Sequence, residues 1–583
     1  MTKKESAVDV LIIGAGPAGL MAAMWMTKCG ITTRLVEQRP YQLRVGGADG
    51  IHPRSMEMFE SFGLDQEITQ VWEPITGWAL WCRNAEGTLA RSDRMDNPTP
   101  VRCRWGPGLL QQGIIERIIK EHISEQPFVR IEYETVPSSL VINEDALDDS
   151  DSHPCVLSLR HDNGAEELVR AKYVIGADGA RSWTRKQLGF RMEGTRTRSV
   201  WAVTDLVVVS DFPDYGEGGL FFLRRERGLT RFYVQLNRAD EEEFPAASIT
   251  QELIIQKLRS LLSPYTFTVK RCEWWSSYTV AHYLSNGMTK HDRVFLVGDA
   301  VHNHSPLVGL GMNISMHSHT NATPRDSYNL GWKLAGVLKK QLNPAILSTY
   351  ETERRPVAEE LIETDRFHLQ LFDAVTVTGS EPAWMQEREE ALQPSMQGFA
   401  VHYQDPLLTA ATEKEHRPDA VTPGKRFPQL TVSNHATGKV YSIQSLLKSE
   451  GRFHVIVFAR DLSQPQELDR FNTFGTALEQ IEEQIVPASM GKFNVIAVHR
   501  THKTAIELAR MANIFFPVDE HTGRDYNRVY CDMETSYEEA GISERGAVVL
   551  VRPDQYVGWC GELQDVAGLT RYLQPIFEVK QHA

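Results

Sequence analysis

Cysteine is scarce in this chain. Seven cysteines are scattered over 583 residues, and none of them stands in a C-x-x-C pair. An odd, scattered set of this kind argues against a disulfide framework and against a zinc site built from closely spaced ligands. We therefore expect reduced thiols, no metal site and an intracellular protein.

Long apolar runs and clustered positive charge are also missing. No stretch is long and apolar enough to cross a bilayer, and the first ten residues lack the apolar segment of a signal peptide. The net charge of −14 disfavours nucleic acid and anionic membranes, because both require a clustered positive field. These absences predict a cytoplasmic protein without a nucleic-acid partner or a membrane span.

The remaining composition is that of an ordinary globular protein, with 42% hydrophobic and 24% charged residues. The length exceeds what a single core supports and predicts two or three domains. The acidic stretch "EDALDDSDSH" at 144–153 is interpreted as a solvated hairpin loop.

The clearest motif lies near the N-terminus. An apolar strand over 8–13 leads directly into Gly14, Gly16 and Gly19, and the helix that follows should end near Gly30. In dinucleotide-binding folds these glycines permit a tight turn, the approach of a pyrophosphate and close helix–strand packing, and an acid after the second strand binds ribose. The residues expected at the dinucleotide are Gly14, Gly16, Pro17, Ala18, Gly19, Glu37, Gln38 and Arg39.

Two later segments favour FAD over NAD. A strand in 171–189 leads into a Gly-Ala-Asp-Gly turn containing Asp178, and a strand in 292–306 ends at a Gly-Asp-Ala turn containing Asp299. An acid at the end of a strand, beside a helix start, can hold a ribityl hydroxyl while backbone N–H groups face the isoalloxazine ring. Asp178 and Asp299 are therefore predicted to bind FAD.

With its three nucleotide motifs in this order, the sequence resembles the FAD-dependent aromatic hydroxylases over nearly its full length. The resemblance is to the phenol 2-monooxygenase and 3-hydroxybenzoate 4-monooxygenase branch of the group A flavoprotein monooxygenases. It implies an α/β and α+β fold: a Rossmann-like FAD-binding domain, an interleaved β-sheet substrate domain and a C-terminal thioredoxin-like domain.

The resemblance also implies a reaction. Reduced flavin and dioxygen form a flavin hydroperoxide, which hydroxylates a small phenolic substrate, here expected in the ortho position. NADPH (or NADH) reduces the flavin from a transient site, which agrees with the presence of a single glycine fingerprint. A homodimer and a polyketide-type phenol of secondary metabolism are the further expectations.

The resemblance divides the chain into interleaved segments. The C-terminal part lacks C-x-x-C, so we expect it to support assembly without redox activity. The predicted boundaries are FAD-binding 1–80, 111–189 and 291–373, substrate domain 81–110 and 190–290, linker 374–424 and thioredoxin-like domain 425–583.

Three catalytic residues are carried over from the family's active site: Asp49, Arg225 and Tyr233. The alternative for Asp49 is that it caps the helix expected to begin near residue 53. A tyrosine that meets the phenol oxygen can help to remove its proton, and an arginine can stabilise the phenolate. The neighbouring Arg224 and Arg227 are expected to be exposed, and the residues expected to line the substrate pocket are Arg231, Trp201 and Tyr278.

A further set of residues is expected to seat the flavin, and one departure from the family falls among them. Nine residues, 317–325, interrupt the family's pattern. Thr323, Pro324 and Asp326 resemble a capping box that would restart a helix after the insertion. The expected flavin contacts are Gly47, Gln112, Pro306, Gly309, Gly311, Met312 and Asn313.

The insertion leaves two functions open. The first is an active phenol hydroxylase, favoured by the presence of Asp49, Arg225 and Tyr233 together. The second is a catalytically silent relative that serves in binding or assembly. A flavin halogenase is weaker, because the W-x-W-x-I-P stretch of those enzymes is absent.

Overall fold

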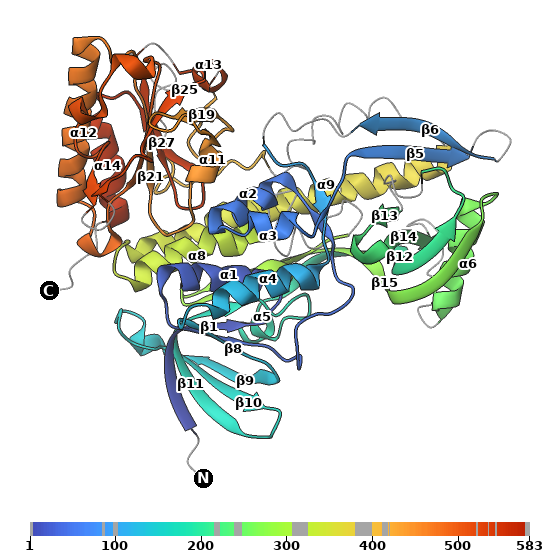
Figure 1. Cartoon of the computed structure of the whole chain (residues 1–583). Helices are drawn as coiled ribbons and strands as arrows, with labels where there is room; N and C mark the ends of the chain where they lie inside the picture. Colours follow the sequence, from blue (N-terminus) through green and yellow to red (C-terminus); the bar gives the residue numbers. More distant parts are fainter. Residues whose placement is uncertain are drawn as a thin grey trace.

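The computed structural model describes residues 4–83, 88–96, 103–214, 222–237, 248–305, 324–378, 399–410, 418, 420–519, 523–533, 536–542 and 545–577. Its three main sheets have eight, five and seven strands. Figure 1 shows the seven-stranded sheet, in orange and red, on one side of the molecule and the five-stranded sheet, in green, on the other. This arrangement confirms the predicted α/β and α+β fold class.

The eight-stranded sheet is built around a parallel β-α-β unit. The strands β1 (Lys4–Ile13) and β2 (Thr33–Val36) pair in parallel and are joined by α1 (Pro17–Cys29). The helix ends at Gly30, whose φ of 71° provides a left-handed cap, as the sequence predicted. The other strands are β8 (Val129–Glu132), β9 (Thr135–Ile142), β10 (Cys155–His161), β11 (Glu166–Gly176), β16 (Thr289–Lys290) and β17 (Val294–Leu296).

Apolar helices cover this sheet. Every residue of α1 except Lys28 is buried, and the helix packs against α4 (Gln112–Ser124) and α8 (Pro324–Leu338). Leu330, Leu334 and Val337 of α8 belong to this core, and the partly buried Leu338 packs against it. Burial on several sides explains why α1 is apolar around its whole circumference.

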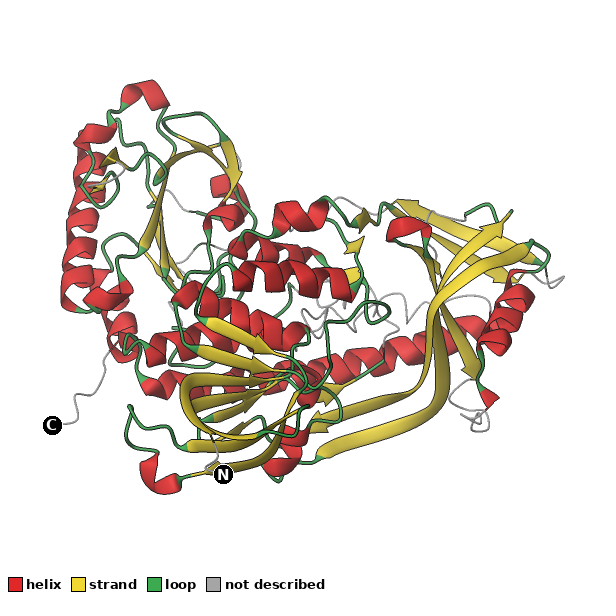
Figure 2. Ribbon diagram, turned by 60° about the horizontal axis from the view of Figure 1, so that its bottom comes forward, coloured by secondary structure: helices red, strands yellow, loops and turns green. Residues whose placement is uncertain are grey.

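The five-stranded sheet is antiparallel and carries long, paired strands. The core between this sheet and α6 (Gln251–Leu262) is apolar, and α9 (Thr349–Thr378) runs from beside α8 towards it (Figures 1 and 2). The strands, in spatial order, are β13 (Phe222–Arg224), β14 (Thr230–Asn237), β12 (Met192–Ser210), β15 (Phe267–Ser285) and β18 (His302–Asn303).

Short elements connect these two sheets. The strand β3 (Gly50–Ile51) pairs with β7 (Gly108–Leu109), which also pairs with β4 (Glu73–Pro74). The remaining elements of this half are α2 (Pro53–Phe62), α3 (Asp65–Thr69), α5 (Trp183–Gln187), the hairpin of β5 (Gly77–Arg83) and β6 (Leu89–Asp96), and the 3-10 turns at Glu144–Ala146, Glu226–Gly228, Gly298–Ala300 and Pro344–Ser348.

The seven-stranded sheet forms the C-terminal part, with strand order β20-β19-β25-β22-β21-β26-β27. The helices α12 (Pro465–Gln484) and α14 (Val566–Phe577) lie on one side of it in Figure 1. Its strands are β19 (Thr431–Asn434), β20 (Val440–Ser442), β21 (His454–Phe458), β22 (Asn494–His499), β25 (Val529–Asp532), β26 (Ala547–Val551) and β27 (Val557–Gly561). Small elements complete it: α11 (Ile443–Leu446), α13 (Ser536–Ala540), β23 (Val518–Asp519) and β24 (Gly523–Arg524).

A buried polar network joins the C-terminal part to the FAD-binding half. Arg552 and Lys333 both bind Glu353 of α9, at 3.0 and 2.7 Å, and all three side chains have no exposed surface. Arg426 binds Glu57 of α2 with an Nε–Oε2 distance of 2.7 Å. Buried ions of this kind must be paired, so these contacts fix the relative position of the two parts. In the described residues, no helix could cross a membrane.

Candidate active site

The glycine-rich loop after β1 has the shape that a pyrophosphate requires. A Cβ atom on Gly14 would lie 2.4 Å from the carbonyl oxygen of Ala177, and one on Gly19 would lie 1.9 Å from that of Gly14. Neither position can carry a side chain. A Cβ on Gly16 would meet no atom within 4 Å, so this glycine leaves open space in front of the α1 N-terminus. The positive end of the helix dipole points into that space.

Glu37 closes the same loop at the end of β2. The carboxylate is 5% exposed, and its Oε2 accepts a hydrogen bond from the backbone N–H of Ala15 at 2.8 Å. The Oε1 atom accepts from the backbone N–H and the Nε of Arg39, at 2.9 and 3.1 Å. The acid is therefore held beside the pyrophosphate space, where it is expected to meet ribose, and Gln38 is exposed next to it.

Gln112 and Gly47 lie together on the other side of the loop region. Gln112, the first residue of α4, accepts from the backbone N–H of Ala48 at 3.1 Å and donates to Glu116 at 2.8 Å. A Cβ on Gly47 would lie 2.7 Å from the Gln112 amide oxygen. These contacts hold the segment before Asp49 against the N-terminus of α4.

The two acids predicted to hold the ribityl chain have different surroundings. Asp178 uses its carboxylate to start α5, since Oδ2 accepts from the backbone N–H of Thr184 at 2.8 Å and Oδ1 accepts from the Ser182 hydroxyl. Asp299 is half-buried in the 3-10 turn after β17. Asp178 therefore acts as a local cap, and its contact with FAD remains a prediction.

Asp326 has a role that the capping-box interpretation missed. The helix α8 begins at Pro324, where the sequence predicted its restart. The Asp326 carboxylate accepts from the backbone N–H of Gly298 at 3.2 Å and from Nε of Arg354 at 2.7 Å. It therefore fixes the turn containing Asp299 against α8 and α9. The predicted contacts Pro306, Gly309, Gly311, Met312 and Asn313, the cap Thr323 and residues 317–323 of the insertion lie outside the described residues.

Asp49, Arg225, Arg231 and Tyr233 come together in one buried cluster. The Tyr233 hydroxyl donates to Asp49 Oδ1 at 3.1 Å, while Arg231 Nε and Arg225 Nη1 lie 3.4 and 3.7 Å from Asp49 Oδ2. Asp49 is 2% exposed and each arginine 1%. Arg224 and Arg227 are exposed, as the sequence predicted. The site therefore holds an acid, a phenolic hydroxyl and two guanidinium groups away from water.

Asp49 does not cap the helix that follows it, so that alternative was wrong. The helix α2 begins at Pro53, and His52 occupies its N-cap position. The chain first forms β3, and the carbonyl of Asp49 accepts from the backbone N–H of Leu110 at 2.7 Å. This short strand separates Asp49 from α2 and leaves its carboxylate facing the five-stranded sheet.

Asp205 is a member of the cluster that sequence reasoning missed. It lies opposite Arg231 in the β12–β14 pair and accepts two hydrogen bonds from it, both at 2.7 Å. Arg225 donates to Asp205 at 3.3 Å and to Glu226 at 3.1 and 2.8 Å. A lone acid in the apolar run "WAVTDLVVV" was the available signal, because a buried acid requires a partner.

The two neighbouring carboxylates keep Arg231 protonated. Burial would lower the pKa of Arg231, but the carboxylates of Asp49 and Asp205 outweigh it and raise the pKa well above its usual value. Arg231 is therefore a fixed positive charge that orients Asp49. It also donates to the carbonyl of Gly47, which ties the five-stranded sheet to the loop before Asp49.

Comparison with known proteins identifies the fold's family. Residues 7–365 match the family described as "FAD binding domain", and residues 401–581 match "Phenol hydroxylase, C-terminal dimerisation domain". The chain is 87% identical over 595 residues to FAD-dependent monooxygenase ankC of Aspergillus thermomutatus, with 100% of both chains covered. The chain belongs to the FAD-dependent monooxygenases. Its cofactor is FAD, and the open space at Gly16 and the acid at Glu37 fit this group.

Other relatives of this monooxygenase agree. The chain is 34% identical over 580 residues to phenol 2-monooxygenase fsqG of Aspergillus fumigatus, covering 96% of this chain and 94% of the relative. A solved structure described as a ternary complex of aklavinone-11 hydroxylase with FAD and aklavinone has a TM-score of 0.70 at 22% identity, covering 97% and 99% of the two chains. The last comparison shows the fold alone.

In the monooxygenase, Tyr233 is a hydrogen-bond donor. Its burial, and then the negative charge of Asp49, raise the pKa of its hydroxyl far above the usual value. The hydroxyl thus stays protonated and points its proton at Asp49. A second molecule's hydroxyl can approach only the lone pairs of the Tyr233 oxygen.

An aromatic cluster adjoins Tyr233. Trp201 and Tyr278 face each other across β12 and β15 and pack with Val280, Leu369 and Tyr233. Trp201 is 1% exposed and donates from its indole N–H to Ser199 at 3.0 Å. The buried Tyr278 hydroxyl has no hydrogen-bond partner among the described residues. A buried hydroxyl without a partner beside the Asp49 cluster is suited to a polar group on a bound aromatic ring.

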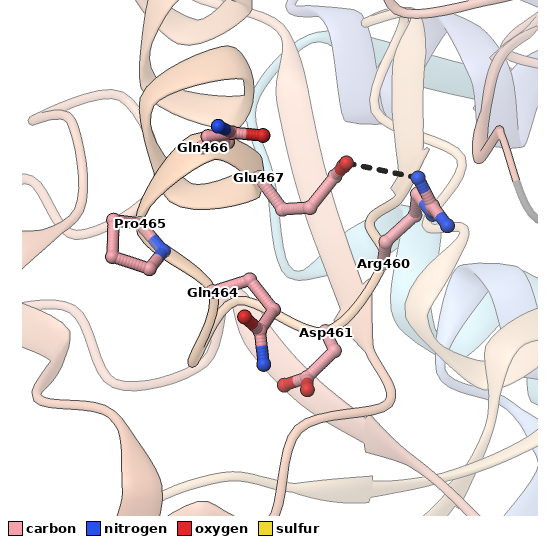
Figure 3. A pocket seen from close by; sticks show the side chains of 6 residues that line it. All are labelled: Arg460, Asp461, Gln464, Pro465, Gln466 and Glu467. Carbon is pink, nitrogen blue, oxygen red and sulfur yellow. Dashed lines mark hydrogen bonds and ion pairs between the residues drawn. The ribbon is translucent and has the colours of Figure 1, made fainter.

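Four other tryptophans of the five-stranded sheet and the β5–β6 hairpin differ from Trp201. Trp274 packs against Gly46 and lies 5.3 Å from the Arg231 guanidinium, whereas Trp275 is 36% exposed. Trp81 donates to Asp214 at 2.6 Å, and the side chain of Trp78 lies outside the described residues. A surface hollow also lies beside the start of α12, but its lining residues, 460–461 and 464–467, include none of the cluster (Figure 3).

Proposed function

We propose that this monooxygenase hydroxylates a phenol in the ortho position, with NADPH as the reductant. The observation that carries the proposal is the hydrogen bond from Tyr233 to Asp49, beside an aromatic cluster that contains the Tyr278 hydroxyl, which has no hydrogen-bond partner among the described residues. An aromatic ring placed against Trp201 and Tyr278 could direct its own hydroxyl towards the Tyr233 oxygen.

The chain's own residues would then move one proton. The substrate hydroxyl donates to the Tyr233 oxygen, and the Tyr233 proton passes to Asp49 Oδ1, so the ring gains the electron density of a phenolate. That density is greatest at the ortho and para carbons, where an electrophilic oxygen adds. Positioned proton transfer of this kind contributes roughly 100- to 10,000-fold in rate.

The two arginines and their acids hold this path in place. Arg231 keeps Asp49 oriented while Asp205 holds Arg231 with two hydrogen bonds, and Arg225 is held by Glu226 in the same way. The pairs are buried, so water does not compete for the proton. When bound, FAD supplies the reduction of dioxygen and the oxygen transfer.

Three further elements of the proposal rest on other observations. NADPH is proposed to act from a transient site because the chain has one glycine fingerprint, which FAD occupies. A homodimer is proposed because residues 401–581 match a family named for dimerisation. Substrates of the polyketide type are supported by the fold shared with an enzyme named aklavinone-11 hydroxylase.

The experiment starts from the purified protein and its visible spectrum. We expect bound oxidised flavin, NADPH oxidation that a phenol stimulates, and a catechol product that takes one oxygen atom from ¹⁸O₂. NADPH consumption without any labelled product across simple and fused-ring phenols would contradict phenol hydroxylation. A para-hydroxylated product would refute the ortho assignment alone, and light scattering would test the dimer.

A further inference from the structure

Three side chains in the C-terminal part form a cluster that the monooxygenase reaction does not use. His435 follows β19, His499 is the last residue of β22, and Cys531 lies on β25. These three strands are neighbours in the sheet, and His499 lies directly opposite Cys531 in the β22–β25 pair. The ligand atoms of all three residues lie within 4.8 Å of one another.

We propose that His435, His499 and Cys531 form a Zn²⁺ site that clips β19, β25 and β22 together. The geometry supports it. His435 Nδ1 lies 3.0 Å from His499 Nε2, and Cys531 Sγ lies 3.8 and 3.7 Å from these two nitrogens. A tetrahedral zinc ion with its usual bond lengths requires an N–N distance of about 3.3 Å and N–S distances of about 3.6 Å. Small side-chain movements would close the remaining differences.

The chemistry of the set also fits zinc. Two imidazoles and one thiolate are the ligand types that zinc prefers, and a three-residue set leaves a fourth position for water. His435 and His499 are buried, whereas Cys531 is half-exposed, so the open position can face solvent.

Metal binding must displace protons from the set. Without metal the facing nitrogens of the two histidines share one proton, and the thiol of Cys531 carries its own proton. On binding, the histidine proton moves to the other ring nitrogen, and the thiol proton leaves to solvent as the Zn–S bond forms.

A second three-residue cluster is not a candidate metal site, because a cation of the chain itself already binds it. Glu132, His161 and Glu167 also lie close together. There, Arg34 donates hydrogen bonds of 2.7 to 3.0 Å to both carboxylates, so its guanidinium group already balances their charge. At the proposed zinc site, the positive charge of Lys503 acts on His435 and Cys531, but no lysine or arginine among the described residues donates a hydrogen bond to the set.

The test uses the full-length holoprotein with Co²⁺ as a spectroscopic probe for Zn²⁺. We expect one cobalt ion per chain, with the visible bands of a tetrahedral site and a thiolate-to-cobalt charge-transfer band. Added Zn²⁺ should displace the cobalt and abolish both sets of bands. Cys531→Ser should lose the thiolate band and most of the affinity. The matched control is Cys272→Ser, which changes another half-buried thiol and should behave as wild type.

Variants of the two histidines test the other proposed ligands. His435→Gln and His499→Gln should each lower cobalt affinity at least tenfold, and Zn²⁺ should raise the unfolding temperature of the wild type but not of these variants. If His499→Gln fails to fold, the near-isosteric Cys531→Ser still decides. Equal cobalt binding by Cys531→Ser and wild type, or no uptake of equimolar cobalt by the wild type, would overturn the proposal.

Discussion

Replacement of Tyr233 by phenylalanine isolates the proposed proton path. The change removes one hydroxyl and keeps the ring, so the packing with Trp201 and Tyr278 remains. It deletes the 3.1 Å hydrogen bond to Asp49, whose carboxylate keeps Arg231 and Arg225 at 3.4 and 3.7 Å. Loss of a hydrogen bond to a charged group costs about 1.5–3 kcal/mol of stability, which a folded chain of this size tolerates.

The effect on the rate should be larger than the effect on stability. Loss of a positioned proton transfer should reduce single-turnover hydroxylation by roughly 100- to 10,000-fold, which corresponds to about 2.7–5.5 kcal/mol in the barrier. The affinity for FAD should not change, because the hydroxyl that is removed donates to Asp49 and not to the glycine loop. A ring-fluorinated series of phenols with falling pKa provides the decisive assay.

The loss in Tyr233→Phe should shrink for phenols that are already ionised at the assay pH, because they have no proton to transfer. Tyr265→Phe is the control, since Tyr265 packs with Trp81 and Phe212 in the same domain and should leave the rate unchanged. A loss of equal size for every phenol would show that Tyr233 acts by packing alone. No loss with any phenol would refute the proton path.

The remaining predictions concern the cofactor and the buried network. Gly16→Ala should fold normally but bind FAD at least tenfold more weakly, because its Cβ would enter the pyrophosphate space. Gly19→Ala should fold poorly, because its Cβ would meet the Gly14 carbonyl. Flavin titration measures the first effect and thermal unfolding the second. Glu353→Gln removes the buried carboxylate that pairs with Lys333 and leaves Arg552 with Asp554 alone, and it should cost about 3–5 kcal/mol at pH 7. The positive charges of Arg552 and Lys333 outweigh burial and lower the pKa of Glu353 from 4.5 to about 2, so its contribution is present above pH 4.5 and is lost as the pH falls towards 2. The difference in unfolding temperature between wild type and Glu353→Gln should therefore narrow over that range, and a constant difference would contradict the assignment.

The elements with a strong local pattern could be predicted from the sequence. The apolar strand, the glycine loop and the helix ending at Gly30 were placed correctly, because backbone conformation and phosphate access fix these residues locally. The exposure of Arg224 and Arg227 was likewise predicted correctly.

Partners brought together by tertiary structure could not be predicted in this way. Asp205 and Arg231 meet only because β12 and β14 pair in one register, and Asp326 reaches Arg354 from another helix. The three proposed zinc ligands are separated by 64 and 32 positions along the chain, so no short spacing reveals them. The capping alternative for Asp49 failed for a local reason, since β3 intervenes before α2.

The most direct test of the central claim is the yield of ¹⁸O-labelled catechol per NADPH oxidised, compared between wild type and Asp49→Asn with FAD bound to both. Asparagine keeps the size of the side chain but cannot accept the proton. The account predicts that the variant still consumes NADPH while its labelled product falls at least 100-fold. An equal yield from the two proteins would contradict the claim that Asp49 receives the Tyr233 proton when the phenol gives up its own.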